Sequence, residues 1–149
     1  MSMIALRVIK ADIYKEVAKT TSYTGAKMAE EAAYDRIFTT DADQELLERF
    51  WNESKDTVTG SLKQLLGAEQ EQSGVYTLTL QVSSSYDTHL TDSIQRSLFS
   101  FFVKNIVSKW FSFANKPDTD GVAKEAASDL EDVLRKAYYK KRPSRPTYT

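Results

Sequence analysis

The clearest hydrophobic pattern in the chain is the alternation of apolar and polar residues over positions 75–82. Tyr76, Leu78 and Leu80 share one side, and hydroxyl and amide residues occupy the other. Period two predicts a strand with one buried face. Because a lone strand leaves its main-chain groups unpaired, we expect a partner. That partner is either residues 4–9, the one internal candidate, or another subunit.

Residues 4–9 open with the same alternation, and helical spacing follows directly. Ile9, Ile13 and Val17 recur every four residues, so the spacing predicts a strand that runs into a helix of about three turns. Serine, threonine and glycine gather at 22–25, and these residues favour turns. We expect a loop there.

A longer amphipathic helix is predicted over residues 41–66. Thr40 is a good N-cap, and two aspartates follow in the first turn, where the helix dipole favours acids. Apolar residues from Leu46 to Leu65 project onto one side. Gly67 is typical of a helix C-terminus. Residues 68–74 are polar without an apolar anchor, which predicts a loop.

The most apolar helix is predicted over residues 87–113. At the α-helical period its apolar residues spread over roughly 200°, against about 100° for an ordinary surface helix. It must therefore be covered on two sides. Val107 and Phe111 fall on the otherwise polar side, and because exposed aromatics are enriched at interfaces we assign both to a subunit interface.

A last helix is predicted over residues 121–140, after a turn at 115–118 with Asp118 or Asp120 as the cap. Its apolar side is uninterrupted and rich in alanine, which allows close approach to another helix. We expect one shared core that contains Leu98, Phe102, Ile106, Leu130 and Leu134.

These elements predict a mainly α fold: a bundle of three to four helices around a central aromatic-rich helix, with a small β element. The 149 residues correspond to one domain. We place a single helical domain at 1–141 and an extended basic tail at 142–149, since two prolines follow the last helix.

The amino-acid composition restricts the kinds of catalytic and metal-binding site that the chain can form. The chain has no cysteine, which excludes disulfides, thiolate nucleophiles and cysteine-ligated metals. Its one histidine, His89, stands near Asp87 and Asp92, but a metal needs three or four ligands. We find no calcium loop, phosphate-binding glycine loop or Gly-x-Ser-x-Gly elbow. We expect no metal, no cofactor and no enzyme activity.

Two features bear on location. The opening residues lack the long apolar stretch of a secretory signal, so we expect an intracellular protein. Arg96, Lys104 and Lys109 interrupt the aromatic-rich helix, which argues against a membrane span. An interfacial membrane helix is a second interpretation, and core packing is the one we favour.

Charge is divided unevenly along the chain. Residues 135–149 hold six basic side chains and no acidic one, while the whole chain has a net charge of −1. An extended cationic segment binds either an acidic protein surface or a phosphate backbone, or it serves only as a solubilising end. An acidic body weakens nucleic-acid binding, so we favour a protein partner. The predicted interface comprises Tyr76, Leu78, Val107, Phe111, Lys140, Lys141, Arg142 and Arg145.

Residues 20–27, 35–40 and 46–51 together resemble small proteins encoded among the structural genes of prophages from gut bacteria. The resemblance covers the first third to half of the chain and carries no catalytic motif. It implies a head-to-tail connector, a tail-completion factor or a tail-assembly component, which is an analogy of genomic setting.

From the residue patterns and the resemblance together, we expect a non-enzymatic phage neck or tail component that works as a homo-oligomer or with other phage structural proteins. It would reside in the host cytoplasm or in the virion. The alternative is a small nucleic-acid-binding protein that uses the basic tail with weak, non-specific affinity.

Overall fold

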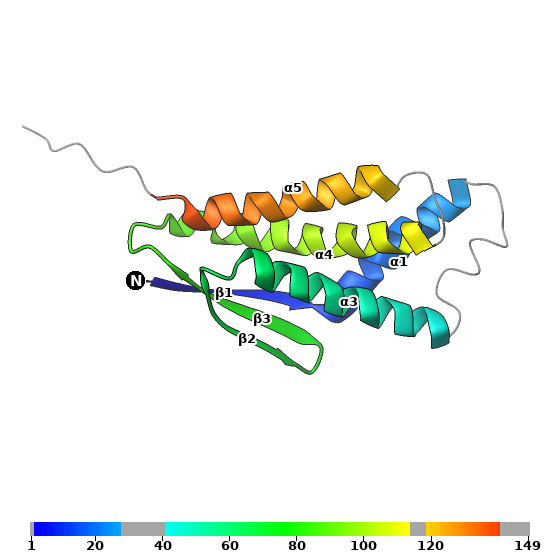
Figure 1. Cartoon of the computed structure of the whole chain (residues 1–149), viewed down its shortest axis with the longest axis horizontal. Helices are drawn as coiled ribbons and strands as arrows, with labels where there is room; N and C mark the ends of the chain where they lie inside the picture. The colour runs from blue at the N-terminus through cyan, green and yellow to red at the C-terminus, as the bar shows by residue number, and fades with distance from the viewer. Residues whose placement is uncertain (1, 28–40, 114–118, 141–149) are drawn as a thin grey trace, which may run out of the picture.

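The computed structural model describes residues 2–27, 41–113 and 119–140, and the side chains of 21–27, 41–43 and 113 are outside that description. Within these ranges the protein is mainly helical, with one small antiparallel sheet (Figure 1). The elements in chain order are β1 (Ser2–Ile9), α1 (Lys10–Lys27), α3 (Asp41–Ser61), β2 (Leu66–Gln72), β3 (Val75–Val82), the short 3-10 helix η1 (Thr88–Leu90), α4 (Thr91–Phe113) and α5 (Thr119–Tyr138).

The sheet has the order β1-β3-β2, and both pairings are antiparallel. β1 pairs with β3 from Ser2 opposite Val82 to Ile9 opposite Val75. This confirms the predicted strand at 75–82 and its predicted internal partner. The second partner, β2, was missed, so β3 is a central strand with both edges occupied.

The prediction of a loop at 68–74 is wrong, because β2 covers most of it. Every β2 residue after Leu66 is exposed, so the strand shows no apolar alternation. A tight hairpin creates it: Ser73 and Gly74 have φ values of 53° and 77°, the left-handed pair of a two-residue turn. Gly67 lies at a register shift in this strand, where an added Cβ would approach Met3 Cε to 3.3 Å. It therefore serves the sheet and does not end a helix.

Two predicted helix boundaries are also wrong. α3 ends at Ser61, five residues early, because the chain turns at Leu62 and the Leu65 carbonyl accepts a 2.7 Å hydrogen bond from the Gln81 N–H of β3. α1 continues through residues 22–25 to Lys27. Hydroxyl residues and one glycine lower helix stability by about 1 kcal/mol or less each, which is too little to end it.

The two C-terminal helices match their predicted positions within four residues. Asp87 precedes η1, and its carboxylate accepts a 3.1 Å hydrogen bond from the His89 N–H before α4 begins at Thr91. α5 begins at Thr119, so Asp120 lies in its first turn and is not its cap. The predicted cap residues Thr40 and Asp118, and the turn at 115–118, lie outside the described residues.

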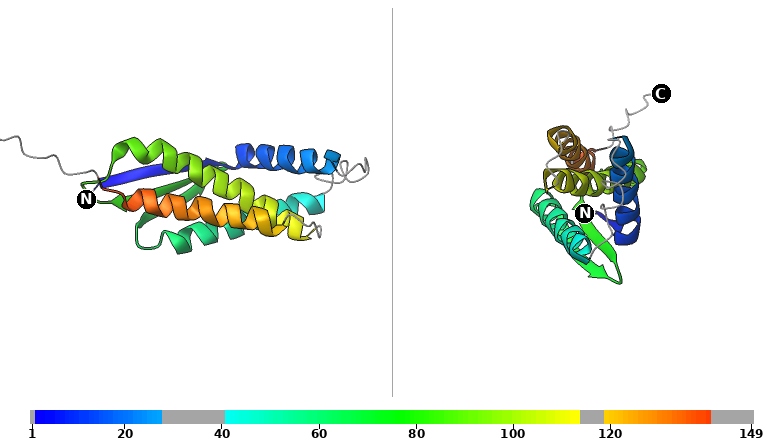
Figure 2. Two further views of the ribbon diagram at one scale, coloured as in Figure 1. Left: turned by 90° about the horizontal axis from the view of Figure 1, so that it is seen from above. Right: turned by 90° about the vertical axis from the view of Figure 1, so that its right-hand side faces the viewer.

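The helices lie on one face of the sheet (Figures 1 and 2). α4 contacts α1, α3, α5 and β1, which explains why its apolar residues need such a wide arc. The predicted shared core is confirmed: Leu98, Phe102, Ile106 and Leu130 are buried, and Leu134 packs against them half-buried. None of the described helices is long and apolar enough to cross a membrane.

Candidate interaction surfaces

Four predicted interface residues are buried inside the subunit, which corrects that assignment. Tyr76 and Leu78 are 2% and 0% exposed, because β3 is flanked by two strands and its apolar side faces the helices. Val107 and Phe111 are 1% and 4% exposed. Helices cover α4 on several sides, so these two residues are buried even though they stand apart from its main apolar arc.

The basic part of the predicted interface has a different outcome. Lys140 is exposed and lies just after α5, where it forms an isolated antiparallel bridge with Tyr86. Lys141, Arg142 and Arg145 lie outside the described residues. Tyr138 and Tyr139 are 50% and 52% exposed. The end of α5 therefore presents two half-exposed aromatic rings beside a cation.

Both outer strands of the sheet carry features that oppose pairing with another chain. At β1, the Gln95 carboxamide oxygen accepts the Arg7 N–H at 2.8 Å, and its amide group donates to the Arg7 carbonyl. At β2, Glu69 and Glu71 stand opposite Leu78 and Tyr76, on the face of the sheet that meets the helices. Inward-pointing charges of this kind protect edge strands, so the edges are poor association sites.

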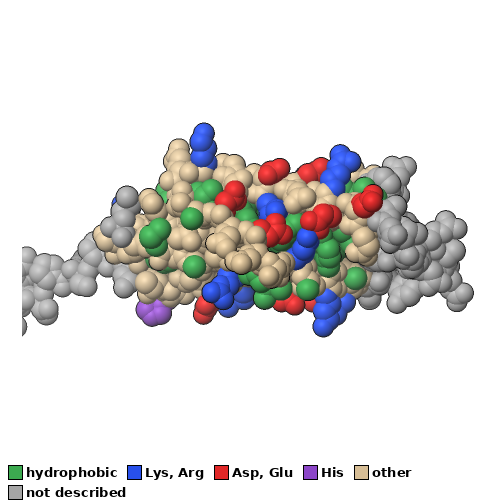
Figure 3. Space-filling model, turned by 90° about the horizontal axis from the view of Figure 1, so that it is seen from below, with side chains coloured by type: hydrophobic (Ala, Val, Ile, Leu, Met, Phe, Trp, Pro, Cys, Tyr) green, Lys and Arg blue, Asp and Glu red, His purple; other side chains and the backbone are tan. Residues whose placement is uncertain are grey.

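The outer face of the sheet is the face whose side chains alternate with the buried ones of β1 and β3. On β1 and β3 it carries threonine, glutamine and alanine side chains together with the apolar Met3, Ile9 and Val75, and Arg7 is its one charged residue. Met3 and Ile9 are 59% and 44% exposed there. Seen from below, the molecule shows hydrophobic side chains in small patches among acidic and basic ones, and these patches form no continuous surface (Figure 3). This composition is that of a solvated sheet face.

The strongest concentration of ionisable groups surrounds Trp51. We define the Trp51 cluster as the rings of Tyr14, Trp51, Tyr76 and Phe102 together with Lys10, Glu48, Lys55, Glu69 and Glu71. Trp51 is fully buried, and its ring centroid lies 5.0 Å from that of Phe102 and 6.3 Å from that of Tyr76. The cluster joins α1, α3, α4 and the β2–β3 hairpin.

Every polar group of the Trp51 cluster has a partner. The Trp51 indole N–H donates to Glu71 at 2.9 Å, and Lys55 forms an ion pair with the same carboxylate. Tyr76 donates to Glu69 at 2.6 Å. Tyr14 donates to Glu48 at 3.0 Å. Among the described residues, no buried side-chain nitrogen or oxygen is left without a hydrogen bond.

The cluster perturbs its titratable groups in opposite directions. Burial, and then the hydrogen bond to Glu69, raises the pKa of Tyr76 above its usual 10.0. Burial raises the pKa of the Glu71 carboxyl too, but hydrogen bonds from Lys55 and Trp51 outweigh it and leave that pKa below the usual 4.5. Perturbed groups often mark active sites, and ion-pair networks perturb them as well. Because each group here is already paired, the cluster fastens the hairpin to the helices.

His89 lies in the short helix η1, at the surface of the protein. Its side chain is 89% exposed, and its Nδ1 lies 3.0 Å from the Asp87 carboxylate. Within the described ranges, no three histidine, cysteine or acidic side chains gather closely enough to hold a metal ion.

A row of polar contacts joins α4 to α5. Ser97 donates to Asp132 at 2.8 Å, and Ser100 donates to Asp129 at 2.6 Å. Lys136 donates to Ser93 at 2.6 Å and pairs with Asp132. The hydrogen bond from Lys136 holds the pKa of Asp132 below its usual 3.8, although burial opposes it. These contacts set the pairing of the two helices.

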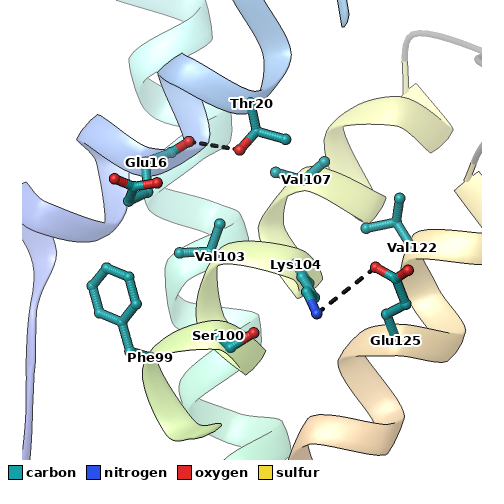
Figure 4. A pocket seen from close by; sticks show the side chains of 9 residues that line it. All are labelled: Glu16, Thr20, Phe99, Ser100, Val103, Lys104, Val107, Val122 and Glu125. Carbon is teal, nitrogen blue, oxygen red and sulfur yellow. Dashed lines mark hydrogen bonds and ion pairs between the residues drawn. The ribbon is translucent and has the colours of Figure 1, made fainter. Parts of the chain in front are cut away.

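A groove of 280 Å³ opens between α1 and α5, with α4 as its floor (Figure 4). Phe99, Val103 and Val107 lie on the floor, one helical turn apart. We call it the α1–α5 groove; its remaining lining residues are Glu16 and Thr20 from α1, Ser100 and Lys104 from α4, and Val122 and Glu125 from α5.

The α1–α5 groove is not apparent from the sequence. The one sequence feature that points to this groove is the width of the apolar arc on residues 87–113, which two flanking helices do not cover completely.

No protein-family model, curated protein or solved structure matches this chain.

Proposed function

We propose that the protein is a non-enzymatic structural or assembly protein, a phage neck or tail component that acts by associating with further copies of itself. The resemblance to prophage structural proteins supplies the setting. A helix bundle around the aromatic-rich α4 supplies the rigid body that such a component needs.

The observation that carries the proposal is the division of charge. Six basic side chains and no acidic one follow position 134, and the chain as a whole has a net charge of −1, so the rest of the molecule is acidic by a similar amount. Lys140 is exposed beside Tyr138 and Tyr139, at the end of the molecule where α5 stops (Figure 1). One chain thus carries both halves of an electrostatic pair, which favours contacts between copies.

Sedimentation velocity of the full chain tests the proposal. At micromolar concentration and low salt we expect species heavier than the 16.9 kDa monomer. Because exposed charge pairs are screened, these species should dissociate as the salt concentration rises toward 1 M. A strict monomer under all these conditions would contradict association between copies.

Nucleic-acid binding is the second candidate, favoured by the same exposed tyrosines and cations. With about four phosphate contacts, the log–log slope of affinity against salt should be near −3.6. We expect weak binding because the body of the protein is acidic. Tight, salt-sensitive binding to a DNA duplex that is lost on removal of residues 141–149 would favour this candidate over the first.

A further inference from the structure

The α1–α5 groove has an apolar floor between two acidic walls. Phe99, Val103 and Val122 are only half-buried by the described residues. Glu16 stands on the α1 wall and Glu125 on the α5 wall, with side chains 44% and 64% exposed (Figure 4). The groove therefore suits a ligand with an apolar or aromatic group flanked by positive charges.

The cation already in the α1–α5 groove does not satisfy both walls. Lys104 Nζ lies 3.3 Å from Asp129 and 3.8 Å from Glu125, so α5 carboxylates share its charge. Glu16 is 3.6 Å from Lys19, a pair on the surface of α1 with a mostly exposed lysine. Exposed pairs of this kind contribute little, which leaves both walls able to accept a further cation.

The end of the chain has the matching chemistry. Residues 141–149 contain three basic side chains, one aromatic residue, Tyr148, and no acidic residue. Pro143 and Pro146 exclude a regular helix across the segment and favour an extended conformation. The aromatic ring matches the apolar floor of the groove in chemistry, and the basic side chains match its acidic walls.

The proposed association between copies assigns the segment to the groove of a second copy. Lys140 forms a backbone bridge with Tyr86 just after the C-terminal end of α5. Val122 lies near the N-terminal end of the same helix. From Val122 to Tyr138 the helix rises about 24 Å. Eight extended residues from Lys140 to Tyr148 reach about 25 Å, so a segment that doubled back over its own helix would reach Val122 only at full extension.

We propose that residues 141–149 of one copy bind in the α1–α5 groove of the next copy. This inference rests on the proposed function and names the contact that would carry it. The two surfaces that meet are different, so the association is head-to-tail and propagates into a ring or an open filament.

Two variants, one on each side of the contact, test the proposal. A chain that stops after Lys140 lacks the segment, and the double variant Glu16→Lys, Glu125→Lys reverses both acidic walls. In sedimentation velocity, we expect each to raise the dissociation constant about tenfold or more, because like charges then face each other or the ligand is gone. The double variant Glu45→Lys, Asp56→Lys is the control: it makes the same charge change at exposed positions of α3, a helix that contributes no residue to the lining of the groove.

Mixing the two variants gives the sharpest result. The truncated chain keeps an intact groove, and the groove variant keeps an intact segment, so each alone should be monomeric while the mixture forms a one-to-one dimer. A synthetic peptide of residues 141–149 should dissociate the wild-type assembly, and the same peptide with Tyr148→Ser should do so poorly.

The outcomes separate this inference from the proposed function. Assemblies that persist in the truncated chain would overturn the contact and leave the proposed function standing. Equal effects of the groove and α3 double variants would also overturn the contact, and so would peptide binding that leaves the oligomeric state unchanged. A full chain that is monomeric under every condition would overturn both.

Discussion

Two regions of this protein bring lysine next to tyrosine, and they differ in what surrounds the pair. In the Trp51 cluster, Lys55 Nζ lies 5.7 Å from the Tyr76 ring centroid and forms an ion pair with Glu71. After α5, Lys140 is exposed beside Tyr138 and Tyr139, and no described acidic side chain forms an ion pair with it. Lysine and tyrosine stabilise the fold in the Trp51 cluster, where carboxylates surround them. After α5 the same residue types are available to a partner.

Removing a ring from the Trp51 cluster should have the largest effect. Phe102 is fully buried, and its ring contacts those of Trp51, Tyr76 and Phe101. We expect Phe102→Ala to lower the free energy of unfolding by about 3–5 kcal/mol in urea denaturation. Tyr138→Ala, at the half-exposed end, should cost about 0.5 kcal/mol or less. Similar losses for the two variants would remove the distinction between the regions.

Removing a carboxylate from the Trp51 cluster should have an intermediate effect. Glu71→Ala leaves the buried Trp51 N–H without its acceptor and Lys55 without its ion-pair partner, which should lower the free energy of unfolding by about 1–3 kcal/mol. Gln70→Ala is the matched control, since Gln70 is the neighbouring residue on the outer face of β2. If both variants unfold at the same urea concentration, the carboxylate is not stabilising the hairpin.

Alkaline pH should weaken the Trp51 cluster through its tyrosines. Burial raises the pKa of Tyr14 and of Tyr76 above the usual 10.0 in the folded protein, while the unfolded chain ionises near that value. Their contribution is thus complete below pH 10.0 and is lost as the pH rises above it. We expect the melting temperature to fall above that pH, and to fall less steeply in Tyr76→Phe. Parallel curves for the two proteins would contradict this origin.

Removing residues 141–149 should have the smallest effect on stability. The described core contains no residue beyond Ala137. Truncation should therefore change the free energy of unfolding by about 0.5 kcal/mol or less and barely shift the melting temperature. Thermal unfolding followed by circular dichroism measures it at a protein concentration where the full chain is monomeric. Loss of the cooperative transition would show that the segment belongs to the fold.

The sequence predicts the elements whose pattern is one-sided. Alternation identifies β3, and helical spacing identifies α4 and α5, because each of these elements buries one continuous side. β2 escapes the same reasoning, since its exposed residues satisfy no burial pattern and only the hairpin at Ser73 and Gly74 holds it in place.

The predicted interface residues show more clearly what the sequence alone does not reveal. Val107 and Phe111 stand apart from the main apolar arc of α4, which suggests a second subunit, yet they are buried within the same chain. A sequence reports that a residue is apolar and where it falls on its helix. It does not report which neighbour covers it.

By itself, the sequence determined the mainly helical class, the strand at 75–82, and the cationic end of the chain. Each follows from local periodicity or from charge counted along the chain. Only the tertiary structure decided that Glu71 accepts a hydrogen bond from Trp51 and pairs with Lys55. It likewise decided that Gln95 forms hydrogen bonds with the backbone of Arg7 at the outer edge of β1. It also decided that an apolar groove stays open between α1 and α5. The physical reason is that contacts between residues far apart in the chain depend on how helices and strands pack, and no local spacing encodes that packing.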